Sequence, residues 1–222
     1  MKLRLIAAPA ILFVLLSASL VIQQFISSQI VSRVERDIPK ASGISASVPL
    51  ADLPSNITSD SIKSAKINIE SFSLKETGTQ VSLEISASNV RKAKPNVVGS
   101  LEVTATIPAS TLTKSSQFND AQIVGNTLQV SAGAGGLGTA FLIPKYVNNQ
   151  LYFELQSVSF LGSQIPASSL PAELQTQIKS RSQRNLTPPK GLTVNSVSLS
   201  SKGLSVKMSG SNIQIGSLGS NF

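Results

Sequence analysis

Alternation of apolar and polar residues from residue 44 onward restricts this chain to a small number of folds. Apolar side chains occupy every second position in several short runs, for example residues 44–48 and 81–85. This period of two places them on one face of a β-strand. Dipeptides that favour tight turns separate the runs: Thr77-Gly78, Gly125-Asn126, Asn148-Asn149 and Lys202-Gly203. The sequence therefore predicts strands that follow one another through hairpins and pair in an antiparallel sheet.

One pattern occurs three times, as INIESFSL from Ile67, FELQSVSF from Phe153 and LTVNSVSL from Leu192. In each copy the apolar residues shift by one position at the step from a polar residue to Ser, so a flat strand would turn the last pair to the opposite face. One extra residue at that step, a β-bulge, returns the pair to the first face and bends the strand. We therefore expect three bulged strands in a strongly curved sheet, which encloses a helix or a ligand, or closes only over its own core.

Short helices are predicted from a repeated hexapeptide. IPASTL at residues 107–112 returns as IPASSL at residues 165–170, and proline is tolerated in the first turn of a helix. A further helix is predicted over residues 171–180, where apolar side chains recur at a spacing of four. The longest helical pattern covers residues 22–38 and ends at Pro39, as a helix packed on the domain or lying along a membrane surface.

The N-terminus predicts export. Lys2 and Arg4 precede the uncharged residues 5–22, whose length suits a secretory signal or a single membrane anchor. Small residues near the end of this segment permit cleavage, and both alternatives leave the remainder of the chain outside the cytoplasm. We interpret residues 1–22 as the signal or anchor and residues 23–222 as one domain of the cell envelope, anchored or secreted to a periplasm-like space.

The absence of two residue types excludes most catalysis. Without cysteine the chain forms no disulfide and no thiolate metal site. Without histidine it lacks Ser-His-Asp catalysis, imidazole zinc ligands and the usual general base near neutral pH. Its 11 acidic residues are scattered, with no pair in a context for glycosidase chemistry. We therefore expect no enzymatic activity, no metal and no cofactor.

A glycine-rich segment, GAGGLG at residues 133–138, has the glycine spacing of a dinucleotide-binding loop. Such a loop opens a helix, whereas the residues that follow it here, TAFLIPKY, favour a strand. We therefore interpret the segment as a flexible loop between two strands.

Positive charge is concentrated toward the C-terminus of a chain whose net charge is +8. No acidic residue follows Glu173, whereas six basic residues do: Lys179, Arg181, Arg184, Lys190, Lys202 and Lys207. This surface is either simply solvated or attracts an anionic partner. Nucleic acid is a poor candidate, because tryptophan is absent and no nucleic-acid module is recognisable. An anionic phospholipid membrane fits better, since Lys and Arg near such a surface contribute about 1 kcal/mol each.

Two stretches resemble a known protein family: LEVTATIPASTL from Leu101 and LTPPKGLTVNSVSLSSKGLSVKMSGSNIQI from Leu186. They are similar to the LmeA-like phospholipid-binding proteins of actinobacterial cell envelopes. Residues 103–108 match a V-x-A-x-(V/I)-P motif that leads from a strand into a short helix. Residues 189–194 resemble the family's Pro-Gly-Leu-x-Val hairpin, and Gly203-Leu204 resembles its second Gly-Leu.

The resemblance covers most of residues 25–215 and departs from the family near residues 48–66, where VPLADLPSNIT replaces an aromatic-Pro step. It implies an α+β fold in which a strongly curved antiparallel β-sheet is wrapped around a long helix, resembling tubular lipid-binding folds. It also implies phospholipid binding without catalysis, for lipid transfer or envelope maintenance. The alternatives are an anchored structural or adhesion module with a sealed core, and a hydrolase that runs on carboxylates or on Ser and Lys.

The predicted lipid site is an apolar trough with a basic rim. The trough consists of apolar residues of the three repeated stretches and a nearby aromatic: Ile69, Phe72, Leu74, Phe141, Phe153, Val158, Phe160, Val197 and Leu199. The rim, which would meet a headgroup or a membrane surface, consists of basic side chains: Arg91, Lys92, Lys94, Lys179, Arg181 and Arg184.

Overall fold

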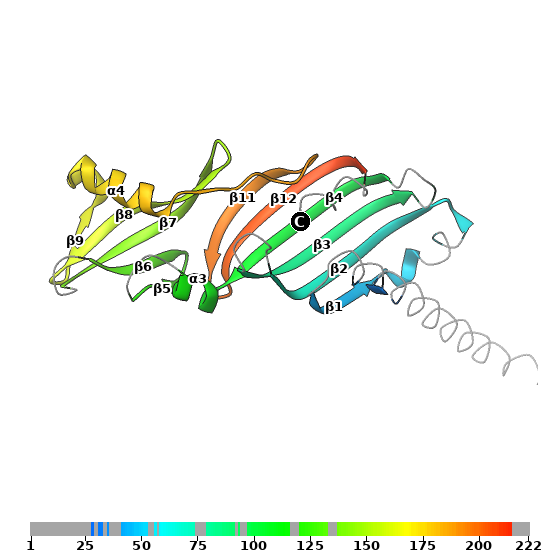
Figure 1. Ribbon diagram of the computed structural model, residues 1–222, viewed down its shortest axis with the longest axis horizontal. Coiled ribbons are helices and arrows are strands. Elements are labelled where there is room, and N and C mark those ends of the chain that lie inside the picture. The colour runs from blue at the N-terminus through cyan, green and yellow to red at the C-terminus, as the bar shows by residue number, and fades with distance from the viewer. Residues whose placement is uncertain are drawn as a thin grey trace, which may run out of the picture. The chain divides into compact units, whose positions relative to one another are not determined.

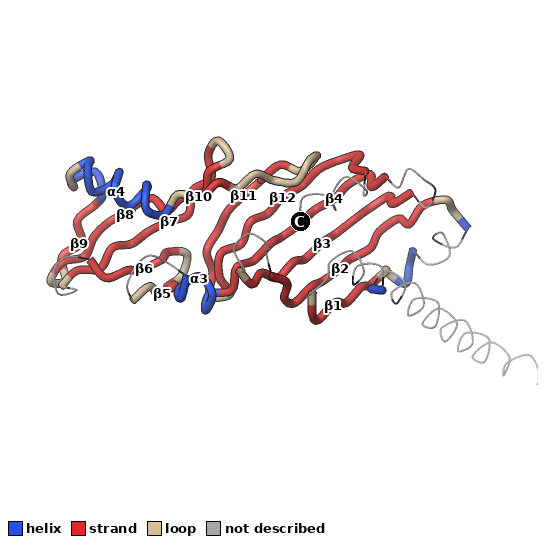
Figure 2. The backbone as a smooth tube through the Cα atoms, in the orientation of Figure 1, coloured by secondary structure: helices blue, strands red, loops and turns tan. Residues whose placement is uncertain are grey.

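The computed structural model describes residues 28, 31–32, 35, 41–52, 56, 58–73, 79–91, 93, 97–115, 120–132 and 137–214. This part of the chain is mostly β-structure, arranged as two six-stranded sheets with two short α-helices of described bounds (Figures 1 and 2). The antiparallel pairing predicted from the hairpin signals is confirmed. Within the helix predicted over residues 22–38, residues 28, 31, 32 and 35 are helical, and the other residues of that segment lie outside the described part.

The chain forms two compact units. Unit 1 contains Met1–Phe72, Leu83–Glu102 and Gly210–Phe222, and unit 2 contains Ser73–Ser82 and Val103–Ser209. The single domain expected over residues 23–222 stays a prediction.

Sheet A has the strand order β1-β2-β3-β4-β12-β11. Its strands are β1 (Ser42–Ser47), β2 (Ser61–Ser73), β3 (Gln80–Arg91), β4 (Val97–Pro108), β11 (Thr193–Ser200) and β12 (Gly203–Gln214). Asn89 in β3 and Asn212 in β12 have positive φ angles of 53° and 54°. Asparagine tolerates this left-handed backbone better than most residues, which lets a strand change the face that its side chains present.

Unit 1 has an apolar core of its own. Most of its buried apolar side chains come from β2, β3, β4 and β12: Ala65, Ile69, Phe72, Leu83, Val98, Leu101 and Ile213. Val48, which precedes the short 3-10 helix η1 (Leu50–Asp52), is also buried. The buried Asn56 side chain accepts a hydrogen bond from the backbone N–H of Lys63 at 2.8 Å, which fixes the chain just before β2.

Sheet B has the strand order β10-β8-β7-β6-β5, with β9 paired to β8. Its strands are β5 (Gln122–Val124), β6 (Thr127–Ala132), β7 (Gly138–Val147), β8 (Gln150–Phe160), β9 (Ser163–Pro166) and β10 (Arg184–Asn185). The predicted turns at Gly125-Asn126 and Asn148-Asn149 are confirmed, with positive φ at Gly125 and at both asparagines. The turn predicted at Lys202-Gly203 lies one residue earlier, because Ser200 pairs with Gly203.

Two of the three predicted bulges are confirmed by the strand register. Leu155 pairs with Leu142 and Ser157 pairs with Phe141, so Gln156 is the extra residue in β8. Likewise Val194 pairs with Met208 and Ser196 with Lys207, which leaves Asn195 as the extra residue in β11. Each bulge therefore lies at the step from a polar residue to Ser.

The third predicted bulge is not present on the side of β2 that pairs with β1. Ser42 pairs with Ser71 and Ile44 with Ile69, so this register runs without a break past Glu70. Ile69 and Phe72 are nevertheless both buried, although they are three positions apart and a flat strand would turn them to opposite faces.

The prediction of a sheet wrapped around a long helix needs correction. Within the described residues there is neither a long helix nor a strongly curled sheet. In unit 2 the apolar face of sheet B packs instead on α3 (Ala109–Ser115) and on the β11–β12 hairpin, through Leu112, Leu199 and Leu204. A short helix and a hairpin thus cover the apolar face of sheet B, where the family resemblance implied a long helix.

The repeated hexapeptide forms the same strand-to-helix device twice, as predicted. The first copy ends β4 and begins α3, and the second ends β9 and begins the 3-10 helix η3 (Ala167–Ser169). Helix α4 (Ala172–Ser182) follows, close to its predicted bounds. Strand β7 begins at Gly138, the last residue of the glycine-rich segment, so the prediction that a strand and not a helix follows it is confirmed.

Helix α4 completes the open edge of β8. Phe153 lies between the residues of β8 that pair with β10 and those that pair with β9. There the Ser182 Oγ accepts a hydrogen bond from the backbone N–H of Phe153 at 2.9 Å. We expect Ser182→Ala to lower the free energy of unfolding by about 1–2 kcal/mol, because this backbone N–H loses its partner. Chemical denaturation measures the loss.

Ser180→Ala is the matched control. The exposed Ser180 hydroxyl donates only to the Gln177 carbonyl within the same helix, at 3.0 Å. Both substitutions gain the same helix propensity, so their difference isolates the bond to Phe153. Equal effects of the two substitutions would show that α4 does not depend on that bond.

Candidate lipid-binding site

The described trough residues divide between the two units. Ile69 and Phe72 are buried in the core of unit 1. The remaining described members belong to unit 2: Phe141, Phe153, Val158, Phe160, Val197 and Leu199. Leu74 lies outside the described residues. Of the three strands expected to form the trough, only β8 and β11 therefore contribute its residues within unit 2.

Four of these side chains meet in the core of unit 2. Phe153 and Leu199 are buried members of that core, and Val158 and Val197 pack against it half-buried. The centre of the core is closed, since Leu128 and Leu142 have no exposed surface. An acyl chain therefore finds no open trough at this level of sheet B.

Phe141 and Phe160 lie differently. Phe141 is half-buried and alternates with the buried Leu142, so it points to the opposite face of β7 from the core. Phe160 pairs with Gly138 at the end of β8 and shares the core face, but 44% of its surface is exposed. The core face of sheet B thus continues beyond its covered centre.

A groove of about 340 Å³ opens beside the core where β7 passes the bulge of β11. Its lining comes from residues 144–146 of β7 and residues 194–197 of β11. Pro144, Tyr146, Val194 and Val197 supply its apolar surface, and Val197 also packs against the core. The groove is therefore an opening at the margin of the same apolar face.

The Tyr146 ring is held in place at the groove. Its hydroxyl donates to Asn149 Oδ1 at 2.8 Å, and the backbone N–H of Leu186 donates to the Asn149 carbonyl at 2.8 Å. These bonds fasten the β7–β8 turn to the segment after β10. The groove consequently has one rigid aromatic wall.

A basic and aromatic cluster lies next to the groove on sheet B. Lys145 also lines the groove and lies 3.5 Å from Glu154 Oε2 through its Nζ, with about half of each side chain exposed. Tyr152 pairs with Lys145 across the strands, and the Lys179 Nζ lies 4.5 Å from the centre of the Tyr152 ring. A cation over an aromatic face is an attractive arrangement that leaves ammonium hydrogens for a second partner.

The predicted basic rim is only partly assembled. Lys179, Arg181 and Arg184 are exposed near the C-terminal end of α4, within unit 2. Arg91 is exposed in unit 1, whereas Lys92 and Lys94 lie outside the described residues. Arg184 also donates through Nη1 to the Gln183 carbonyl at 2.7 Å, which fixes the turn after the helix.

Sequence reasoning missed Lys145 and Asn195 as site residues. Both line the groove, and Asn195 is the extra residue of the β11 bulge. The repeated pattern located that bulge, and bulges often lie beside functional sites, so the signal for this position was present. The proximity of Lys145 to β11 and to α4 depends on tertiary packing and has no local signal.

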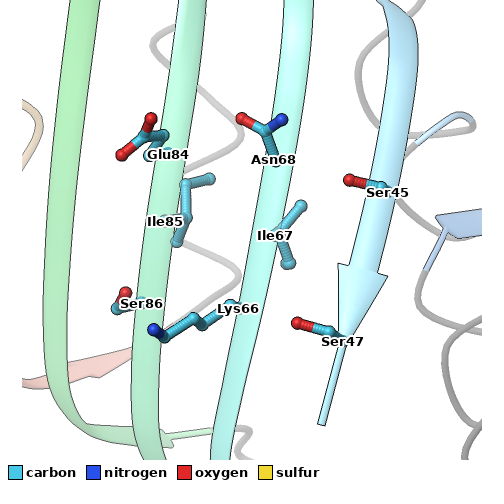
Figure 3. Close-up of a pocket in the computed structure, with 8 residues that line it drawn as sticks. All are labelled: Ser45, Ser47, Lys66, Ile67, Asn68, Glu84, Ile85 and Ser86. Carbon is cyan, nitrogen blue, oxygen red and sulfur yellow. The ribbon is translucent and has the colours of Figure 1, made fainter.

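A second groove, of about 280 Å³, lies in unit 1 over β1, β2 and β3. Figure 3 shows two polar rows across these strands, one of Glu84, Asn68 and Ser45 and one of Ser86, Lys66 and Ser47. The two rows are polar or charged, and Ile67 and Ile85 supply apolar side chains between them.

Comparison of the chain with protein-family models, with curated proteins and with solved structures finds no match. Among the described helices, none is long and apolar enough to span a membrane. The described acidic side chains include no group of three placed to hold a metal ion.

Proposed function

We propose that this chain is an exported protein of the cell envelope that binds phospholipid without catalysis, for lipid transfer or envelope maintenance. One observation carries the proposal: apolar side chains line part of the groove at the β11 bulge, Val197 among them also packs against the core, and a basic cluster adjoins the groove. A phospholipid needs both surfaces, because its acyl chain is apolar and its headgroup carries a phosphate.

The apolar part of the groove suits one section of an acyl chain. Burial of a methylene group gains about 0.8 kcal/mol relative to water. The acyl chain leaves a bilayer, however, so the net gain of transfer is near zero and exchange depends on fit and headgroup contacts. At about 340 Å³ the groove is at the lower end of the volumes typical of ligand sites, so it holds a section of a lipid rather than a whole one.

The basic cluster suits the phosphate. Lys145 and Lys179 present ammonium groups beside the groove, and neither is buried. The ion pair of Lys145 with Glu154 is half exposed and therefore costs little to exchange for a phosphate. Because the chain carries a net charge of +8, we expect it to prefer lipids with an anionic headgroup.

A sealed structural or adhesion module is the competing function. The closed centre of the unit 2 core favours it, because Leu128 and Leu142 leave no space for a ligand there. The two functions differ in what the purified protein carries. Native mass spectrometry of the full chain, released gently from membranes, detects bound phospholipid for a carrier and a mass without ligand for a structural module.

The groove itself is tested by Val194→Asp. A carboxylate placed against an acyl chain is unfavourable, so we expect the phospholipid recovered per folded molecule to fall about tenfold or more. Thr193→Asp is the matched control, because Thr193 is the exposed neighbour on the opposite face of β11. Native mass spectrometry with lipid extraction measures both variants. Unchanged loading in Val194→Asp would place the lipid site elsewhere.

A further inference from the structure

We propose that one end of sheet B inserts into the surface of a lipid bilayer. The apolar tip of this end consists of Leu137, Phe160, Leu161 and Ile165, which are 61%, 44%, 78% and 37% exposed. Strand pairing gathers them, because Phe160 pairs with both Gly138 and Ser163 and Val158 pairs with Ile165. Figure 2 shows the β8–β9 turn and the start of β7 at this same end of the sheet. The proposal concerns docking and does not depend on the lipid groove.

The turn at the tip has a backbone conformation that is unfavourable for its first residue, Leu161. Leu161 and Gly162 connect β8 to β9 and both have positive φ, 48° and 82°. Hairpin turns of this kind favour Asn or Asp followed by Gly, since a bulky side chain is strained at positive φ. Leu161 therefore contributes neither favourable turn geometry nor packing, and an exposed apolar residue held under strain indicates a functional role.

The tip is free of charge in a chain that has 19 basic and 11 acidic residues. The sequence has no charged residue over residues 121–144 and 155–172, and all four residues of the tip lie within these ranges. Charged side chains are the groups that most oppose entry into the apolar layer of a membrane. The backbone N–H and C=O groups of the β6–β7 and β8–β9 pairs bond to each other, so shallow insertion leaves few of them without partners.

A bilayer suits the tip better than a protein partner does. A stable protein interface uses about 20–30 residues on each side, far more than this turn and its neighbours present. The apolar residues 5–22 also bring the chain to a membrane, as a signal or an anchor. Because Lys179 lies over Tyr152, toward the other end of β8 from Phe160, insertion of the tip relies on apolar contact. It therefore tolerates salt and neutral lipid.

The absence of tryptophan allows a direct test on the full chain in phosphatidylcholine vesicles. Leu161→Trp supplies a single emitter at the tip, and lipids brominated on their acyl chains quench tryptophan that enters the membrane. The matched control is Val147→Trp, which is 49% exposed at the opposite end of β7. We expect a blue-shifted emission that brominated lipid quenches for Leu161→Trp at low and high salt, and no quenching for Val147→Trp.

A second pair of variants tests the strained leucine. Leu137→Trp reports on the tip from the neighbouring strand, and Leu161→Asn replaces the leucine with a residue that favours this turn. We expect the quenching of Leu137→Trp to be lost when Leu161→Asn is added, while the unfolding midpoint stays equal or rises. Leu137→Trp also carries the test if Leu161→Trp does not fold.

Equal emission and equal absence of quenching at residues 137, 161 and 147 would overturn the proposal. Emission that shifts with protein concentration but not with brominated lipid would overturn it in favour of a contact with a second copy. Docking and lipid carriage fail separately. Quenching at the tip without co-purified phospholipid removes the carrier function alone, and co-purified phospholipid without quenching removes the docking tip alone.

Discussion

Phe153→Ala is expected to lower the free energy of unfolding by about 3–5 kcal/mol, as the truncation of a core aromatic side chain does. Phe153 is 7% exposed and belongs to the closed core of unit 2. Its loss removes buried apolar surface and leaves a cavity that sheet B cannot easily fill, because β7 pairs along β8 and the Ser182 hydroxyl of α4 bonds to the Phe153 backbone on the other side. Guanidinium unfolding of the full chain, combined with amide hydrogen exchange in unit 2, measures the effect.

Phe160→Ala is the matched control on the same strand. The β8 bulge at Gln156 keeps Phe153 and Phe160 on one face, but Phe160 is 44% exposed. We expect it to cost less than about 1 kcal/mol, because a half-exposed side chain has less burial to lose. Losses of similar size for the two variants would mean that the face is covered along its whole length and that its exposed end offers no binding surface.

The sequence predicted the local features of this fold well. Period-two runs and turn dipeptides located the strands and most hairpins, because strand formation and turn geometry depend on adjacent residues. The repeated Ser pattern located the bulges at Gln156 and Asn195 to the residue. The β8–β9 turn escaped prediction, since Leu161-Gly162 is not a dipeptide that favours positive φ.

The arrangement of the strands was not predictable in the same way. Whether a helix or another sheet covers an apolar face is decided by long-range packing, and both choices require the same alternation along the strand. The family resemblance implied a curved sheet around a long helix, whereas the structure has a core between sheet B, α3 and the β11–β12 hairpin. The grouping of Lys145, Tyr152 and Lys179 depends on the same packing.

Gly203→Ala is expected to lower the free energy of unfolding by about 2–5 kcal/mol. Gly203 has a φ of 133°, where an L side chain is strained by about 1–2 kcal/mol. An added Cβ would also overlap the Ile107 carbonyl oxygen and lie 2.8 Å from the Ala109 backbone nitrogen, and such overpacking adds about 1–3 kcal/mol. Guanidinium unfolding of the full chain measures the sum.

Gly125→Ala separates the two causes, because Gly125 has a φ of 61° and nothing within 4 Å of an added Cβ. It should cost only the strain of about 1–2 kcal/mol. The excess at Gly203 measures how firmly the β11–β12 turn is held against the β4–α3 junction, where the Ala109 N–H donates to the Lys202 carbonyl at 3.0 Å. If both substitutions cost the same, that junction moves far enough to accept the added Cβ at little cost, and the hairpin that covers the core of unit 2 is free to open.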